Sequence, residues 1–486
     1  MAVRCNFIRF FKGPGGCGEV LRIALPLVLS TGALTIQMFI DRVFLMWYAS
    51  ETMSAAMHSG LVNYTIFSLF LGTAMYVNTF VAQYDGAGVP KRVGASVWQG
   101  IYFSIIAGLL MIAIAPLAET VMNWSGHDPI VRKHEVIYFR ILCFGAMPGL
   151  ITATLACFYT GRGKTWTVMW VNIASITVNI VLDYGLIFGN WHLPRWGIAG
   201  AAWATVFASV LSTVIYFILF LRQRSHKDYA TLGGWRLDKE LFIRLMRFGL
   251  PCGVQFMLDV FGFALFVTFI GRINPLSLVA TSMAFQINSL AFMPMFGFNM
   301  AVSTLVGRSL GKGRPDLAQR STWSAACVTM CYMTIIAAGY WFIPDLFMYP
   351  FALQANPAEF ALVKPVVVRL LCFVAFYCLF DTGNLIFSGA LKGAGDTRFV
   401  MIVTVVLNWL LMVVPSYFVI KLTKETTGLY LAWLALTVYV CTLSIVFLFR
   451  FLSGKWKKMR VIEAVPHAIP PNMPPVPTVE TELTDK

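Results

Sequence analysis

Four aspartates interrupt strongly apolar stretches of this chain. They are Asp41, Asp183, Asp259 and Asp381, and the residues around each are mostly Leu, Ile, Val, Phe and Met. A carboxylate at the centre of an apolar span costs about 2.5–3.5 kcal/mol on insertion scales, so each needs a partner, water, or a bound proton or cation. Four such groups predict an interior that binds and releases ions.

The segment around Asp183 also carries a stripe of uncharged polar side chains. Asn172, Ser175 and Asn179 precede Asp183 by eleven, eight and four residues, so all four fall near one line on a helix. Amide, hydroxyl and carboxylate oxygens are hard ligands that suit sodium, and the carboxylate alone could take a proton. An interhelical hydrogen-bonded seam is the alternative. The ionised group favours the ion site, because a seam of amides would avoid its cost.

The second half of the chain surrounds its acids differently. Gln255 lies one helical turn before Asp259, and Tyr377 lies one turn before Asp381. A run rich in methionine and phenylalanine follows between them. Its candidate residues are Gln286, Asn288, Met293, Met295 and Phe296. Such side chains adapt to varied apolar shapes and attract organic cations, so together with Tyr377 they predict a substrate cavity, although core packing or lipid contact is the simpler interpretation.

The elements that carry these residues are predicted to be membrane-spanning helices. The chain is 58% hydrophobic and only 12% charged, and about 20 consecutive apolar residues suffice for a helix to cross a bilayer. This composition makes a soluble class of protein remote. The twelve expected spans lie near residues 19–48, 56–82, 94–118, 133–158, 167–189, 197–221, 244–271, 277–305, 321–346, 362–390, 399–420 and 427–452.

The formal net charge of +15 indicates topology rather than nucleic-acid binding. Lysine and arginine gather in alternate connections, as at Lys91 with Arg92 and at Arg162 with Lys164. Basic connections stay on the cytoplasmic side of a membrane. We therefore expect both termini to be cytoplasmic and nucleic acid not to be a partner.

Motifs for other kinds of chemistry are missing from the sequence. The ten cysteines predict neither disulfides nor zinc binding, and none of the six histidines has a second ligand at metal-binding spacing. No phosphate-binding loop, nucleophile elbow or paired DDxxD motif occurs. We therefore expect no enzyme activity and no cofactor, and energy must come from an ion gradient or a partner.

The chain contains an internal repeat. Residues 81–98 (VAQYDGAGVPKRVGASVW) align without a gap on residues 306–323 (VGRSLGKGRPDLAQRSTW), at an offset of 225, and the glycine motifs at 161–163 and 393–395 align at an offset of 232. The four acids do not follow the repeat, so each half carries its own pair. Six helices per half return the chain to its starting side, which predicts two similarly oriented lobes related by a pseudo-two-fold axis along the membrane normal.

The predicted fold is an all-α polytopic membrane protein with twelve transmembrane helices in two six-helix lobes. The expected parts are a cytoplasmic N-terminus (1–18), an N-lobe (19–221), a cytoplasmic linker (222–243), a C-lobe (244–452) and a disordered cytoplasmic tail (453–486). We predict a disordered tail because a segment with six prolines and a polar C-terminal end cannot form a packed helix.

Several short motifs in combination resemble the multidrug and toxic compound extrusion (MATE) family. They are EVLRIALPLVLS with FIDRVFL, the VAQYDGAG loop, NIVLDYGLIFG, GIAGAAWATV, GLPCGVQFMLD and FDTGNLIFSGALKGAGDT, and the resemblance extends over residues 19–452. The resemblance implies a twelve-helix antiporter that extrudes cationic, amphipathic compounds in exchange for protons or sodium. Features of the NorM-like and the DinF-like branches are mixed.

The resemblance also implies roles for individual residues. Those matching the family's cation-coupling site are Asp41, Tyr138, Asn179, Asp183 and Thr205. Bound sodium would be held by Asp41, Asn179 and Asp183. Asp259 and Asp381 resemble the acidic positions of the NorM-like branch, whereas Asp183 is more typical of the DinF-like branch. This mixture leaves the coupling ion open between a proton and sodium.

From these features we expect a monomeric, secondary active multidrug efflux antiporter in the cytoplasmic membrane, which exchanges organic cations or amphipathic drugs for protons or sodium by alternating access. Two alternatives stay open. A lipid-linked saccharide flippase of the same superfamily shares the twelve-helix plan but would line its cavity with basic residues, for which Arg140, Arg272 and Arg369 are candidates. A membrane-embedded transferase would need clustered acids to hold magnesium, which the spacing does not demand.

Overall fold

The computed structural model describes residues 13–123, 127–222, 228–352, 357–423 and 426–463, and this part of the chain is helical without strands. The helices of the first half are α2 (Cys17–Tyr48), α3 (Ser50–Met75), α4 (Val77–Gly86), α5 (Pro90–Ile114), α6 (Ala118–Asn123), α7 (Pro129–Thr160), α8 (Thr165–Phe188) and α9 (Ile198–Leu221). Those of the second half are α11 (Lys239–Gly271), α12 (Pro275–Gly311), α13 (Pro315–Phe342), α14 (Pro344–Ala352), α15 (Pro357–Ala394), α16 (Thr397–Leu407), α17 (Val414–Leu422) and α18 (Thr426–Leu452).

Within the described residues, twelve helical segments are long and apolar enough to cross a membrane. In this count α3 with α4, α5 with α6, and α16 with α17 each form one span. The twelve spans expected from hydropathy are confirmed, and their observed ends differ from the expected ones by a few residues.

Local sequence explains where several helices begin. Pro90, Pro129, Pro275 and Pro315 occupy the first turn of α5, α7, α12 and α13, where a missing N–H has no helical partner to lose. The expected start of the C-lobe at residue 244 is too late, because α11 begins at Lys239. Asp238 caps that helix, with its Oδ1 accepting a hydrogen bond from the Leu241 N–H at 3.1 Å.

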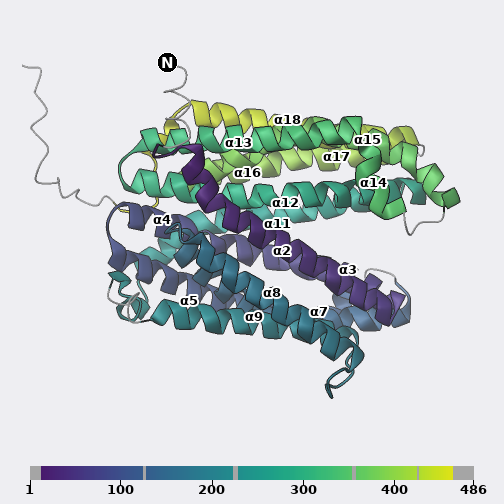
Figure 1. The fold of residues 1–486 in the computed structure, drawn as a ribbon, viewed down its shortest axis with the longest axis horizontal. Coiled ribbons are helices and arrows are strands. Elements are labelled where there is room, and N and C mark those ends of the chain that lie inside the picture. The colour runs from purple at the N-terminus through teal and green to yellow at the C-terminus, as the bar shows by residue number, and fades with distance from the viewer. Residues whose placement is uncertain (1–12, 124–126, 223–227, 353–356, 424–425, 464–486) are drawn as a thin grey trace, which may run out of the picture.

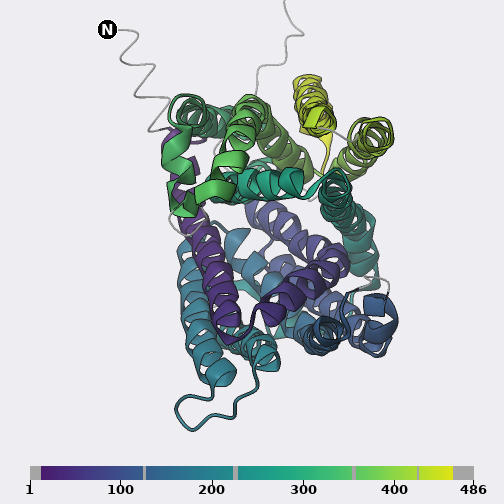
Figure 2. The same ribbon diagram turned by 90° about the vertical axis from the view of Figure 1, so that its right-hand side faces the viewer.

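The helices form two lobes (Figures 1 and 2). Helices α2–α9 make one lobe and α11–α18 make the other, so the predicted two-lobe plan is confirmed. Across the lobes α2 packs against α12, and α3 packs against α11. The Thr31 hydroxyl of α2 donates to the Met293 carbonyl of α12 at 3.3 Å. The interior between the lobes is therefore bounded by the first and second helices of each half.

The internal repeat appears as a pair of reciprocal close contacts between the lobes. A Cβ atom on Gly86 would lie 2.1 Å from the Arg308 carbonyl oxygen, and one on Gly311 would lie 2.2 Å from the Gln83 carbonyl oxygen. Both glycines and both partners are related by the offset of 225 residues. The pseudo-two-fold axis thus passes between α4 and α12, and only glycine allows this approach.

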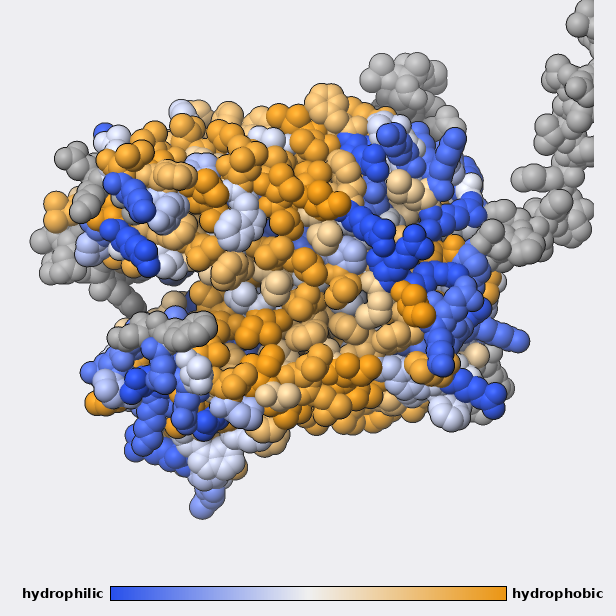
Figure 3. Space-filling model, turned by 180° about the vertical axis from the view of Figure 1, so that it is seen from behind, coloured by the Kyte–Doolittle hydropathy of each residue, from blue (hydrophilic) through white to orange (hydrophobic). Residues whose placement is uncertain are grey.

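The surface divides into an apolar band and two polar ends. Figure 3 shows the band around the middle of both lobes, with hydrophilic residues concentrated at either end. One end, called the basic end below, carries the turn at 86–89, the turn at 311–314 and the C-terminal segment 453–463. At the opposite end, called the open end, Figure 3 shows a notch between the lobes.

The C-terminal segment differs from the expectation of disorder after residue 453. The Trp456 side chain is fully buried and stacks on Phe451 with ring centroids 4.9 Å apart. The Val461 N–H donates to Gln83 Oε1 at 2.9 Å. These contacts order the chain as far as Glu463, so the prediction is wrong for residues 453–463, and the proline-rich remainder (464–486) lies outside the described residues.

Candidate ion-coupling and substrate site

Helices α2 and α8 bring together the two acids of the N-lobe. The carboxyl groups of Asp41 and Asp183 lie within hydrogen-bonding reach of one another, and Asp183 is fully buried. In the described part of the chain, no N–H or O–H donor is supplied to either oxygen of Asp183. Two adjacent carboxylates repel each other when both are ionised. A proton or a metal cation between them removes this repulsion, so the pair can bind either.

An amide pair from the same two helices borders these acids. Gln37 Nε2 donates to Asn179 Oδ1 at 2.5 Å, and Gln37 also lies near Asp41. Asn179 is completely buried, as is Asp183 one turn further along α8. The oxygen of Asn179 retains a second lone pair. Sequence reasoning did not single out Gln37, although it precedes Asp41 by one helical turn.

The rest of the polar stripe on α8 forms a seam with neighbouring helices. Asn172 Nδ2 donates to the Ser30 hydroxyl on α2 at 2.6 Å, and the Ser175 hydroxyl donates to the Ala208 carbonyl on α9 at 3.1 Å. The seam interpretation therefore holds for Asn172 and Ser175, and the ion site at Asn179 and Asp183 stays a prediction. The part of the stripe nearer the basic end of the molecule is a hydrogen-bonded seam. The part nearer Asp183 holds that residue's carboxyl group, which has no hydrogen-bond donor among the described residues.

The two other residues assigned to the N-lobe site differ in placement. Tyr138 on α7 is half-buried and lies within electrostatic range of both Asp41 and Asp183. Thr205 on α9 is also half-buried, but its hydroxyl donates to the Ala201 carbonyl of its own helix at 3.2 Å. Tyr138 thus borders the acid pair, whereas the hydroxyl group of Thr205 donates its hydrogen bond within its own helix.

The acids of the C-lobe each accept one amide hydrogen bond. Asp259 Oδ2 on α11 accepts from Gln255 Nε2 at 3.3 Å, and Asp381 Oδ1 on α15 accepts from Asn384 Nδ2 at 2.9 Å. The carboxyl group of Asp259 lies within electrostatic range of Asp381 and of Lys392. Unlike the pair in the N-lobe, these acids are partnered separately, and Asp259 lies near a cation.

Helix α18 contributes a further side chain near the two acids of the C-lobe. Tyr439 on α18 lies within electrostatic range of Asp259 and Asp381, and its hydroxyl oxygen is 3.5 Å from Asn408 Nδ2. Asn408 begins a π-helical turn, Asn408–Val413, which joins α16 to α17. Such turns are frequent at functional sites. The sequence offered no signal for Lys392, Asn408 or Tyr439, because each becomes relevant only through packing.

The candidate substrate residues are distributed over several environments. Asn288 and Tyr377 are buried and joined by a hydrogen bond of 3.3 Å from Asn288 Nδ2 to the Tyr377 hydroxyl. Met295 is completely buried in the hydrophobic core, in agreement with the simpler interpretation of this run as core packing. The residues with partial or full exposure are Gln286, Met293 and Phe296.

The arginines that would favour an anionic substrate are engaged elsewhere. Arg140 Nη2 donates to Glu119 Oε1 at 2.9 Å, and the guanidinium of Arg369 lies 5.7 Å from the centre of the Tyr430 ring. Two of the three arginines considered for pyrophosphate binding therefore have other partners.

Contacts between the lobes close the basic end. Asn78 Nδ2 donates to the Thr304 hydroxyl at 3.0 Å, Gln83 Nε2 donates to the Gly393 carbonyl at 3.0 Å, and Arg308 Nε lies 3.3 Å from Asp85 Oδ2. With the notch at the other end (Figure 3), these bonds leave the open end as the wider entrance.

The ordered C-terminal segment adds a clamp to this closure. Glu463 Oε2 accepts from the Tyr84 hydroxyl of the N-lobe at 2.7 Å and is paired with Arg244 of the C-lobe. Arg92 Nε of the N-lobe lies 3.3 Å from Glu463 Oε1. Burial alone would raise the pKa of Glu463, but Tyr84, Arg92 and Arg244 together hold that pKa below its ordinary value. Glu463 thus joins both lobes as an anion.

The MatE family model matches residues 26–185 and 251–418, one match in each half and together more than half of the chain. The chain belongs to the MatE family. The resemblance read from short motifs is thereby confirmed, and the duplicated match agrees with the repeat.

Curated MatE-family relatives share about a quarter of their residues with this chain. The "Probable multidrug resistance protein NorM" of Thermotoga maritima is 25% identical over 450 residues, which cover 91% of this chain and 94% of the relative. The "Multidrug resistance protein PmpM" of Pseudomonas aeruginosa is 25% identical over 395 residues, covering 80% and 81%.

Solved MatE-type structures share the fold. An outward-facing multidrug resistance MATE transporter of the MOP superfamily superimposes with a TM-score of 0.83 at 17% identity, covering 93% of this chain and 98% of that chain. A MOP superfamily transporter from Pyrococcus furiosus, described as having a binding pocket of reverse polarity, gives a TM-score of 0.82 at 18% identity, covering 93% of this chain and 99% of that chain.

Proposed function

We propose that this protein is a secondary active efflux antiporter that exchanges cationic or amphipathic drugs for protons or sodium. The observation that carries the proposal is the buried contact between Asp41 and Asp183 inside a MatE-family fold. Such a pair binds one positive charge strongly and a second weakly. It is therefore suited to take up and release one cation per cycle.

The conformation supports a transport cycle with alternating access. The hydrogen bonds of Asn78 and Gln83 and the ion pair of Arg308 hold the basic end closed. An ion entering at the open end would bind Asp41 and Asp183 and weaken retention of a cationic drug. The lobes would then rock, so that the ion leaves and the drug enters at the basic end.

The energy available from one coupled charge is sufficient for drug export. One elementary charge that moves through 100 mV supplies about 2.3 kcal/mol. Because 1.4 kcal/mol corresponds to about a tenfold change in an equilibrium, this supports a drug gradient of roughly fiftyfold.

The C-lobe is the proposed substrate side. Asp381 provides negative charge near the buried Tyr377, whose ring can stack on an organic cation, and Asp259 lies within electrostatic range of Asp381. The names of the NorM and PmpM relatives agree with drugs as substrates. Gln255 and Asn288 would orient these groups through their hydrogen bonds.

The protein is proposed to act as a monomer in the cell membrane with its basic end and both termini in the cytoplasm. The basic turns and the lysine-rich segment Lys455–Lys458 gather at that end, as expected for the cytoplasmic side of a membrane. No cofactor is needed for this cycle beyond the coupling ion, for which Asp41, Asn179 and Asp183 are the proposed ligands if it is sodium.

A resistance assay tests the proposed function. Cells that lack their own efflux pumps and express the wild-type chain should grow at higher concentrations of a cationic dye than cells expressing Asp41→Asn. Both proteins must reach the membrane in equal amounts, as measured by immunoblotting of membrane fractions. Equal resistance of the two strains would refute the assignment of Asp41.

A further inference from the structure

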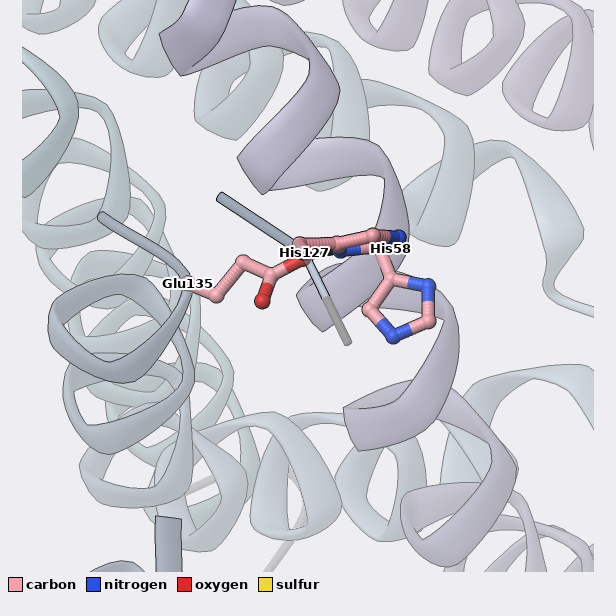
Figure 4. Close-up of side chains that lie close together, drawn as sticks. All are labelled: His58, His127 and Glu135. Carbon is pink, nitrogen blue, oxygen red and sulfur yellow. Dashed lines mark hydrogen bonds and ion pairs between the residues drawn. The ribbon is translucent and has the colours of Figure 1, made fainter. Parts of the chain in front are cut away.

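The open end of the N-lobe holds a cluster of metal-binding side chains. His58 lies on α3, His127 lies just before α7, and Glu135 lies on α7, as Figure 4 shows. One candidate ligand atom from each of the three lies within 4.8 Å of the other two. Spacing could not reveal the cluster, because 69 residues separate the two histidines.

The geometry requires little adjustment to hold an ion. His127 Nδ1 and Glu135 Oε1 are 2.7 Å apart, and the rings of His58 and His127 meet edge to face with centroids 4.7 Å apart. In tetrahedral zinc sites the metal–ligand bonds of about 2.0–2.2 Å place the ligand atoms roughly 3.3 Å from one another. Rotation of the exposed His127 ring and of the half-buried His58 ring would be needed to bring the three atoms to this spacing.

The candidate ligands Glu135 and His127 differ in burial, and this difference suits metal binding. The Glu135 side chain is completely buried, whereas the His127 side chain is 41% exposed. A buried carboxylate is held in place by its surroundings, and an exposed imidazole leaves a route by which an ion can enter. The exposed side also leaves room for water as a fourth ligand, as in open zinc sites with two histidines and one glutamate.

A hydrogen-bonded pair of His127 and Glu135 is the simpler interpretation of these two residues. It gives no role to His58, whose imidazole comes from a different helix to the same place. We propose that His58, His127 and Glu135 bind one divalent metal ion of borderline softness, for which zinc is the best match. Magnesium and calcium prefer oxygen ligands alone, whereas two imidazoles with one carboxylate suit zinc.

A bound ion would join the open ends of α3 and α7. Tyr138, which borders the acid pair, follows Glu135 by three residues on α7 and so lies on nearly the same face, about one turn away. The metal would therefore fix the packing of α7 against α3 directly beside the proposed coupling site. This inference concerns metal binding and does not depend on the transported substrate.

Zinc titration of the purified, full-length protein tests the proposal. The protein carries no polyhistidine tag, and binding is measured in competition with a chromophoric chelator. We expect one zinc ion per chain, with an affinity that falls at least tenfold in His58→Ala, His127→Ala and Glu135→Gln. The matched control is His192→Ala, a histidine of the α8–α9 turn outside the cluster, which should bind zinc as the wild type does.

Melting measurements give a second readout. Zinc should raise the melting temperature of the wild type and of His192→Ala, but not that of His58→Ala, because an ion that binds only the folded state stabilises it. The absence of saturable zinc binding by the wild type would overturn the proposal regardless of how the variants fold. Binding that persists with unchanged affinity in both His58→Ala and His127→Ala would also overturn it.

Discussion

Asp41 on α2 and Asp183 on α8 place their carboxyl groups side by side, although 142 residues separate them in the chain. The contact joins the first and fifth spans of the N-lobe and has no counterpart among the described residues of the C-lobe, where Asp259 and Asp381 each accept an amide hydrogen bond. The two lobes thus share a plan and differ in chemistry.

The paired acids should behave as one functional unit. Asp41→Asn and Asp183→Asn should each reduce the initial rate of dye efflux at least tenfold, and the double variant should lose no more than the worse single variant. The rate is measured per amount of protein in the membrane. Asp345→Asn serves as the control, because that acid is 67% exposed in an ion pair with Lys364. If the efflux rate of the double variant falls by the product of the two single-variant losses, the two acids act independently and the shared site is contradicted.

The acids of the C-lobe should contribute to drug binding. Replacing Asp381 with Asn removes a buried negative charge, and we expect the dissociation constant of a fluorescent organic cation to increase about tenfold, equivalent to about 1.4 kcal/mol. Fluorescence polarisation with the purified protein measures this constant. The control is Asp316→Asn, an exposed acid at the basic end. Unchanged affinity in Asp381→Asn would remove that residue from the substrate site.

The glycines of the repeat should be intolerant of a side chain. Gly86→Ala and Gly311→Ala force a methyl group against a carbonyl oxygen of the other lobe, at 2.1 and 2.2 Å. Overpacking of this kind costs about 1–3 kcal/mol, so both variants should melt at a lower temperature. Gly32→Ala is a suitable control, because a Cβ atom there meets nothing within 4 Å. If Gly86→Ala melts at the same temperature as the wild type, the two lobes do not make this close contact.

The Glu463 clamp should stabilise the protein at neutral pH and fail in acid. A carboxyl group whose pKa is lowered by folding stabilises the fold above its unfolded pKa, near 4.3, and this contribution is lost as the pH falls through the lowered value. Glu463→Gln should therefore reduce the melting temperature by about 1–2 °C at pH 7. The deficit should shrink below about pH 4.

A neighbouring acid provides the control for the clamp. Glu240 pairs with the same Arg244, but its side chain is 80% exposed, so Glu240→Gln should change the melting temperature little at any pH. A deficit in Glu463→Gln that stays constant from pH 7 to pH 3 would show that packing, rather than charge, accounts for the effect.

Features with a regular pattern could be predicted from the sequence. Hydropathy identified the twelve spans, because a bilayer requires a long apolar run for each helix. The offset between Gly86 and Gly311 identified the duplication, because equivalent contacts need equivalent residues. The cost of a lone carboxylate in an apolar segment identified Asp41 and Asp183, which packing then brought together.

Features that depend on packing alone could not be predicted. His58 and Glu135 meet only after α3 and α7 fold together. Met295 lies in the same Met-Phe run as the exposed Phe296, yet it turns into the core. Trp456 follows the last span closely, and its burial against Phe451 orders a segment whose composition indicated disorder. A partner distant in the sequence decides the first case, the rotation of one helix decides the second, and local packing decides the third.

The most direct test of the account measures dye transport by membrane vesicles with imposed gradients. Inverted vesicles containing the wild-type chain should accumulate a cationic dye, and accumulation should stop when the coupling gradient, either of protons or of sodium, is collapsed by its own ionophore. Vesicles with Asp41→Asn should not accumulate dye under any gradient. Accumulation that continues after both gradients are collapsed, or that is unchanged in Asp41→Asn, would contradict ion-coupled export through the Asp41–Asp183 pair.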